Sequence, residues 1–219
     1  MIFANRIAAA RKLVEALSDY RAKNPLILAI PRGAVPMAKL IAQQLKGEMD
    51  VVLVRKLRAP GNPEFAIGSI DESGWIYLTE YAQQVGADQD YIDAEVTEQT
   101  KIIRQRRAQY TPERPPIDPA GRIVIIIDDG LATGSTMIAA LHALRNQKPA
   151  ELVCAIPVAP GDTLRKLQGK ADRIVCLSSP SDFYAVGQFY TDFPQVTDEE
   201  VIACLTQAVE KLSALPLRC

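Results

Sequence analysis

The chain has 219 residues, of which 48% are hydrophobic and 6% aromatic, and its formal net charge is -1. This length allows one large domain with a proper core, and the composition suits an α/β protein rich in aliphatic side chains. The near-neutral charge argues against nucleic acid or an anionic membrane as a partner. No apolar run approaches a bilayer span, and basic residues interrupt the N-terminus, which argues against a signal peptide. We therefore expect a cytoplasmic protein.

The first half of the chain alternates short apolar runs with helical periodicity. In chain order we predict a helix over residues 3–20, a strand over 26–30, a helix to about residue 45 and a strand over 50–54. Residues 55–64, "RKLRAPGNPE", contain two prolines and a glycine, which predicts a loop. Residues 65–70 and 75–78 are expected to pair as short strands.

The second half continues the alternation. In chain order we predict a helix over 88–109, a proline-rich connector over 111–121, a strand ending at residue 127, a helix to about 146, a strand over 151–158, a helix near 161–169 and a strand over 173–177. A capping box, Thr197 to Glu200, starts the last helix. Apolar strands that alternate with helices indicate a mostly parallel sheet covered on both faces, which is a Rossmann-like α/β fold.

The stretch "RIVIIIDDGLATGSTM", residues 122–137, combines features that suit a phosphorylated ligand. Asp128 and Asp129 follow a buried strand, and in a parallel sheet ligands bind beyond the carboxyl ends of the strands. Two carboxylates there can accept hydrogen bonds from neighbouring hydroxyls or hold a hydrated Mg²⁺. The glycine- and hydroxyl-rich loop after them opens a helix, and its N–H groups form an anion cradle. A vicinal diol beside a phosphate, as in ribose 5-phosphate, matches this pattern.

This stretch resembles the phosphoribosyl pyrophosphate (PRPP) binding motif of the type I phosphoribosyltransferases. "AIPRGAVPMA" (29–38) resembles that family's pyrophosphate loop, and "VRKLRAPGNPE" (54–64) resembles the start of its flexible loop. The whole chain also resembles a bacterial group of predicted phosphoribosyltransferases whose acceptor is not established. The resemblance implies a single domain over residues 1–219. Its core covers about 22–178, its flexible loop about 55–68, and its hood comes from 1–20 and 180–219.

The resemblance also implies a role for each motif. Asp128 and Asp129 would bind the ribose hydroxyls, and Mg²⁺ would be held at these acids through the ligand or water. The 5-phosphate would be bound by Leu131, Ala132, Thr133, Gly134, Ser135 and Thr136. Arg32 and Gly33 would bind the pyrophosphate, with a cis peptide expected at Pro31–Arg32. Arg55 and Lys56 would be catalytic cations near the leaving group, and residues 58–66 would close over the site.

The acceptor is the least defined part of the expected site. Some purine-type relatives carry an acid where this chain has Ala132, and alanine cannot take a proton from a base. Adenine-type relatives have alanine there. The expected hood, "SDFYAVGQFYTDF" (181–193), matches no acceptor signature closely. Phe183 and Tyr184, with Phe189 and Tyr190, would either stack on an acceptor ring or pack against the terminal helix.

Other interpretations have less support. A Walker B strand needs an upstream P-loop, and a dinucleotide site needs G-x-G-x-x-G, and neither occurs. The four cysteines lack zinc-site spacing. We interpret the basic run Lys101, Arg104, Arg106 and Arg107 as a solvated helix face. His142, the single histidine, is given no role.

We expect an Mg²⁺-dependent phosphoribosyltransferase that acts on PRPP and a nucleobase-like acceptor. We also expect a homodimer without nucleic-acid or membrane partners. A non-catalytic protein of the same fold that senses PRPP or nucleotides is the alternative.

Overall fold

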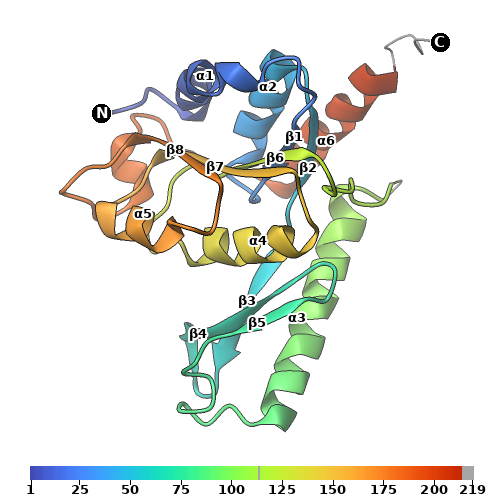
Figure 1. Cartoon of the computed structure of the whole chain (residues 1–219), viewed down its shortest axis with the longest axis vertical. Coiled ribbons are helices and arrows are strands. Elements are labelled where there is room, and N and C mark those ends of the chain that lie inside the picture. The colour runs from blue at the N-terminus through green and yellow to red at the C-terminus, as the bar shows by residue number, and fades with distance from the viewer. Residues whose placement is uncertain (113, 214–219) are drawn as a thin grey trace.

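The computed structural model describes residues 1–112 and 114–213, and its centre is a parallel sheet of five strands (Figure 1). The strand order is β2 (Glu48–Val51), β1 (Leu26–Ala29), β6 (Ile123–Ile127), β7 (Glu151–Val158) and β8 (Arg173–Ser178). Successive side chains of β6 point into two different cores, with Ile125 and Ile127 in one and Val124 and Ile126 in the other. Burial on both faces explains why the strand is apolar throughout.

Helices cover both faces of this sheet, as the α/β prediction required (Figure 1). One face carries α1 (Arg6–Ala16), α2 (Val35–Leu45) and α6 (Asp198–Ser213), and the other carries α4 (Ser135–Asn146) and α5 (Gly161–Leu167). The first helix is shorter than predicted because Asn5 caps it, accepting a hydrogen bond from the Ala8 amide at 2.9 Å, and a 3-10 turn, η1 (Ser18–Tyr20), follows it. The capping box at Thr197 and Glu200 is confirmed by reciprocal hydrogen bonds of 2.8 and 3.2 Å.

A second, antiparallel sheet projects from the core beside the long helix α3 (Gln89–Tyr110), as Figure 1 shows. Its strands are β3 (Val54–Ala59), β4 (Asn62–Asp71) and β5 (Ile76–Leu78). The predicted pairing of 65–70 with 75–78 is confirmed by the register between Gly68 and Leu78 and between Ile70 and Ile76.

The prediction of a loop over residues 55–64 was wrong in secondary structure, because these residues form most of a hairpin. Pro60 and Gly61 occupy its turn, where Gly61 has a φ of 70°, a region that glycine adopts without penalty. Pro63 lies outside the part of β4 that pairs with β5, so its missing N–H breaks no bond of that ladder. Fully buried Leu57 anchors β3. Movement of this hairpin over a ligand stays a prediction.

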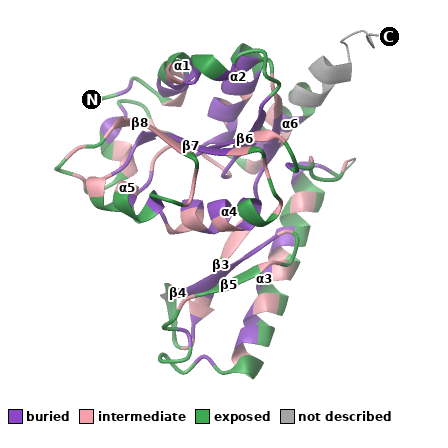
Figure 2. Ribbon diagram, in the orientation of Figure 1, coloured by how far each residue is buried: buried purple, intermediate pink, exposed green. Residues whose placement is uncertain are grey.

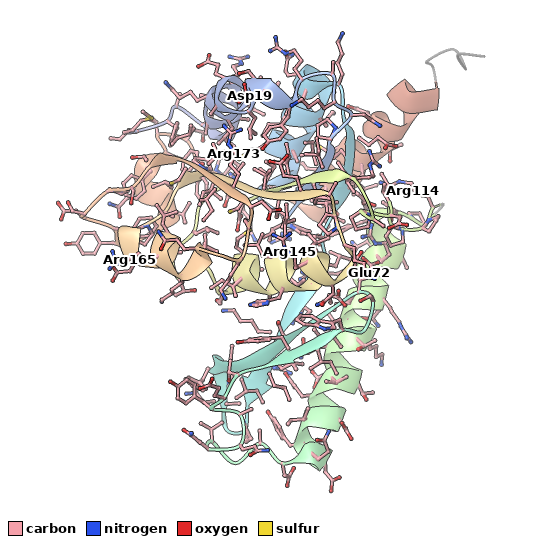
Figure 3. All side chains as sticks on the ribbon, viewed as in Figure 1. Asp19, Glu72, Arg114, Arg145, Arg165 and Arg173 are labelled. Atoms are coloured by element: carbon pink, nitrogen blue, oxygen red, sulfur yellow. The ribbon has the colours of Figure 1, made fainter. Side chains whose placement is uncertain are left out.

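The basic run on α3 was also misinterpreted in part. Arg107 is not solvated: its side chain is 12% exposed and bonds Asp50 at 2.9 Å and Glu72 at 2.5 and 2.7 Å. Asp50 is 1% exposed and also accepts a bond of 2.8 Å from Arg114. Glu72 and Arg114, labelled in Figure 3, lie where α3 meets the core. These contacts fasten the helix and the proline-rich connector to β2.

Figure 2 shows how far the residues of each helix and strand are buried. Strands β1, β2, β6 and β7 and the inward faces of the helices are mostly buried, β8 is partly exposed, and β5 and the outer side of α3 are exposed. Among the described residues, no helix is long and apolar enough to cross a membrane. The predicted hood segment 180–219 includes residues 214–219, which lie outside the described part of the chain.

Candidate functional site

The acid pair lies at the carboxyl end of β6, where the sequence predicted a ligand site. The Asp129 amide donates a hydrogen bond to Asp128 Oδ1 at 2.8 Å. Burial, and then the adjacent charge of Asp129, raise the pKa of Asp128 well above its usual value. The oxygens of the two carboxylates can accept hydrogen bonds, which suits two ligand hydroxyls.

Arg6, which sequence analysis did not assign, and Tyr190, which it suggested only for an acceptor or for packing, hold Asp129 in place. Arg6 Nε donates to Asp129 Oδ2 at 2.8 Å, and the same guanidinium lies 3.7 Å from the Phe193 ring centroid. The Tyr190 hydroxyl donates to the Asp129 carbonyl at 2.6 Å. Arg6 stands 123 positions from Asp129, so no local pattern pointed to this pair.

The predicted pyrophosphate loop lies directly against the acid pair. A Cβ placed on Gly33 would lie 2.0 Å from Asp129 Oδ2 and 2.8 Å from Asp129 Cγ. Only a glycine therefore fits against the Asp129 carboxylate at this position. The Pro31–Arg32 peptide is cis, as expected. Arg32 itself reaches toward α6, where its Nη1 lies 3.6 Å from Asp198 Oδ2. The parallel arrangement of β1 and β6 brings their carboxyl ends together.

The predicted phosphate loop, residues 131–136, connects the acids to α4. The Leu131 amide donates to the Val158 carbonyl at 2.9 Å, which ties the loop to β7. Gly134 has a φ of 73° immediately before the helix, and a Cβ there would lie 2.7 Å from Thr163 Cγ2. The Thr133 and Ser135 hydroxyls lie 3.0 Å apart. The N-terminus of α4 and these hydroxyls therefore provide anion-binding donors.

Arg55 and Lys56 line a cavity of about 360 Å³ that Pro31 and Thr136 also border. The cavity therefore lies between the predicted pyrophosphate loop, the start of α4 and the hairpin. Burial, and then the charges of Arg106 and Arg58, lower the pKa of Arg55. The hairpin thus brings two predicted catalytic cations to the same end of the sheet as the acids.

The aromatic residues suggested to bind the acceptor do not form one cluster. Phe183 packs on Phe189 with a centroid distance of 5.2 Å, whereas the Tyr184 side chain is 90% exposed. Their segment does touch the acid loop, because a Cβ on Gly130 would lie 2.5 Å from Val186 Cγ1. Phe189 and Tyr190 are buried. Their role toward an acceptor stays a prediction.

The acid pair suits a magnesium ion that is shared with a ligand. Within residues 1–112 and 114–213, no group of three or more His, Cys, Asp or Glu side chains could hold a metal by itself. Magnesium is usually bound through one or two carboxylates together with phosphate oxygens and water. Asp128 and Asp129 fit that role only with a phosphorylated ligand in place.

Comparison with known proteins identifies the family of the chain. The chain matches the family model of the phosphoribosyl transferase domain over residues 1–194. It is 39% identical over 209 residues to a Mycobacterium tuberculosis protein whose assignment as a phosphoribosyl transferase is itself provisional. That match covers 94% of this chain and 47% of the relative, so the chain spans about half of its length. The crystal structure of TT1426 from Thermus thermophilus is 44% identical, with a TM-score of 0.85, covering 94% of this chain and 99% of that one.

The fold and the comparisons define the class to which the protein belongs. Its parallel sheet carries helices on both faces, and the family model of the phosphoribosyl transferase domain covers residues 1–194. The chain belongs to the phosphoribosyl transferase family.

Proposed function

We propose that the protein transfers the 5-phosphoribosyl group of PRPP to a nitrogenous, nucleobase-like acceptor and releases pyrophosphate. The observation that supports this most strongly is the contact between Gly33 and Asp129, since an added Cβ would lie 2.0 Å from the carboxylate. Gly33 therefore lies beside Asp129, and this supports adjoining subsites for pyrophosphate and for the ribose hydroxyls. In PRPP, the pyrophosphate leaves from the ribose carbon that is bonded to the carbon bearing the 2-hydroxyl. The pyrophosphate subsite must therefore adjoin the subsite for the ribose hydroxyls.

In this proposal each part of the chain has a separate task. Asp128 and Asp129 bind the ribose hydroxyls, and the loop over 131–136 binds the 5-phosphate through its N–H groups and hydroxyls. Arg55 and Lys56 offset the negative charge that gathers on the departing pyrophosphate, which lowers the barrier. Magnesium, when bound, would add further positive charge toward the same oxygens.

One residue, Ala132, restricts which acceptor the protein could use. Ala132, three residues after Asp129, is exposed and has no titratable group, so it cannot accept a proton from an attacking base. We therefore propose an acceptor that needs no carboxylate base at this position. This requirement disfavours 6-oxopurines.

The binding test uses a double variant, Asp128→Asn with Asp129→Asn. Both carboxylates lose their charge without a change of shape, so Mg²⁺-PRPP binding measured by titration calorimetry should be abolished. The matched control is Asp90→Asn with Asp162→Asn, which removes the same charge from two exposed positions. Unchanged PRPP binding in the first variant would contradict the proposed function.

The catalytic test measures pyrophosphate release from PRPP against a panel of bases, with a no-acceptor control. Release that requires one base and is absent in the double variant would support the transferase. Binding of PRPP without release for any base would favour the sensing alternative.

A further inference from the structure

The cavity between the hairpin and the core has a wall that sequence analysis did not assign. Besides Arg55, Lys56 and Arg58 of β3, its lining includes Arg106 of α3. Pro31 and Thr136 also border it. The long helix therefore contributes a cation to the same space as the expected pyrophosphate loop.

The cations around this cavity differ in how far they are neutralised. Arg58 bonds Glu95 at 2.8 Å and Glu98 at 3.1 Å. By contrast, no carboxylate among the described side chains forms an ion pair with Arg55, Lys56 or Arg106. Arg55 Nε donates to the neutral Gln99 amide at 2.9 Å. Three positive charges thus gather around the cavity without a direct ion pair to those side chains, although the charges of Glu95 and Glu98 also act on Arg55 and partly offset the repulsion.

Their mutual repulsion is visible at Arg55. After burial, the charge of Arg106 is the strongest influence that lowers the pKa of Arg55. Gathering like charges in a partly buried space costs free energy unless an anion binds there. The arrangement therefore favours an anion in the cavity.

The position of Arg106 is set by the anchoring of α3. The next residue, Arg107, is fixed by Asp50 and Glu72, and this holds the end of the helix against the core. The charges of Arg106 and Arg32 both act on the hydroxyl of Tyr110, which donates to Asp198 at 2.5 Å. Arg106 therefore lies in the electrostatic neighbourhood of the pyrophosphate loop.

We propose that Arg106, with Arg55 and Lys56, binds the pyrophosphate group of the ligand in this cavity, so that α3 forms part of the substrate site. This inference rests on the proposed function. It adds a binding residue from an element outside the parallel core and distinguishes Arg106 from its neighbours on the helix. Arg104 does not line the cavity, although Arg104 and Arg106 are both exposed, and Arg107 is occupied by its two acids.

The test compares Arg106→Gln with the matched control Arg104→Gln, which removes the same charge from the same helix. Titration calorimetry would measure Mg²⁺-pyrophosphate and ribose 5-phosphate separately. Loss of a charge-assisted bond should weaken pyrophosphate binding roughly tenfold or more in Arg106→Gln. The affinity of Arg106→Gln for ribose 5-phosphate should stay near that of wild type. The control Arg104→Gln should bind both ligands with affinities near those of wild type. Arg106→Lys, which keeps the charge, should retain more pyrophosphate affinity than Arg106→Gln.

The outcomes separate this inference from the proposed function. If Arg106→Gln binds pyrophosphate like wild type, or if it loses both ligands equally, Arg106 is not a pyrophosphate-binding residue, while the proposed function stands. If the wild-type protein binds neither ligand, both proposals fail.

Discussion

Replacement of Gly33 by alanine tests the contact on which the proposed function depends most. The new Cβ would lie 2.0 Å from Asp129 Oδ2 and 3.2 Å from Arg6 Nη2. Real Cβ contacts stay at 3.0 Å or more, so the carboxylate and the loop must separate by about 1 Å. The Asp129 side chain has little freedom to yield, because Arg6 holds its Oδ2 and its backbone carbonyl accepts the Tyr190 hydroxyl.

The expected effects follow from this displacement. Overpacking a well-packed site costs about 1–3 kcal/mol of unfolding free energy, or a fall in Tm of about 2–12 °C for a chain of this size. A misplacement of about 1 Å in a positioning group costs about 10²-fold in rate. We expect Mg²⁺-PRPP affinity to fall about ten- to hundredfold, since one or two hydrogen bonds to the ribose or pyrophosphate are lost.

The assay is titration calorimetry with PRPP, with Tm measured on the same samples. Gly161→Ala is the matched control, because a Cβ there meets nothing closer than 3.7 Å and should leave binding unchanged. A folded Gly33→Ala protein that binds PRPP as tightly as wild type would refute the reasoning, since the two loops would then not form one ligand site.

Three further predictions concern the phosphate loop, the α3 anchor and assembly. Thr136→Val should weaken nucleoside 5-monophosphate binding by about 1.5–3 kcal/mol and spare free pyrophosphate; calorimetry that shows equal loss of both would place the phosphate elsewhere. Asp50→Asn should lower the free energy of unfolding by about 3–5 kcal/mol, because it breaks a buried charge cluster. Burial raises the pKa of Asp50, but Arg114 and Arg107 outweigh it and lower the pKa. The stabilisation by Asp50 is therefore present above the unfolded pKa of about 3.9 and is lost as the pH falls through the folded pKa. The unfolding free energies of wild type and variant, measured by denaturation, should therefore converge in acid. A difference that stays constant with pH would argue against the ion pairs. We expect a homodimer that uses the exposed apolar strand β5, so Leu78→Glu should shift light-scattering mass toward the monomer, and a monomeric wild type would exclude it.

Elements whose signals are local could be predicted from the amino-acid sequence. The apolar run of β6 predicts a strand buried on both faces, and Asp128 and Asp129 mark its end because charged side chains cannot continue into a core. The glycine- and hydroxyl-rich loop and the α4 helix follow within ten residues. The capping box at Thr197 is equally local. The parallel core and the composition of its central motif could therefore be inferred without coordinates.

Which distant residues meet depends on the tertiary structure. The segment 55–64 has the prolines and glycine of a loop, yet α3 stabilises it as a hairpin through Glu95, which bonds Arg58 from 37 positions away. Arg107 is indistinguishable by sequence from a solvated arginine until Asp50, 57 positions earlier, lies beside it. Arg6 reaches Asp129 across 123 positions. Ion pairs of this kind depend on how the sheet and α3 fold together, and no periodicity along the chain encodes them.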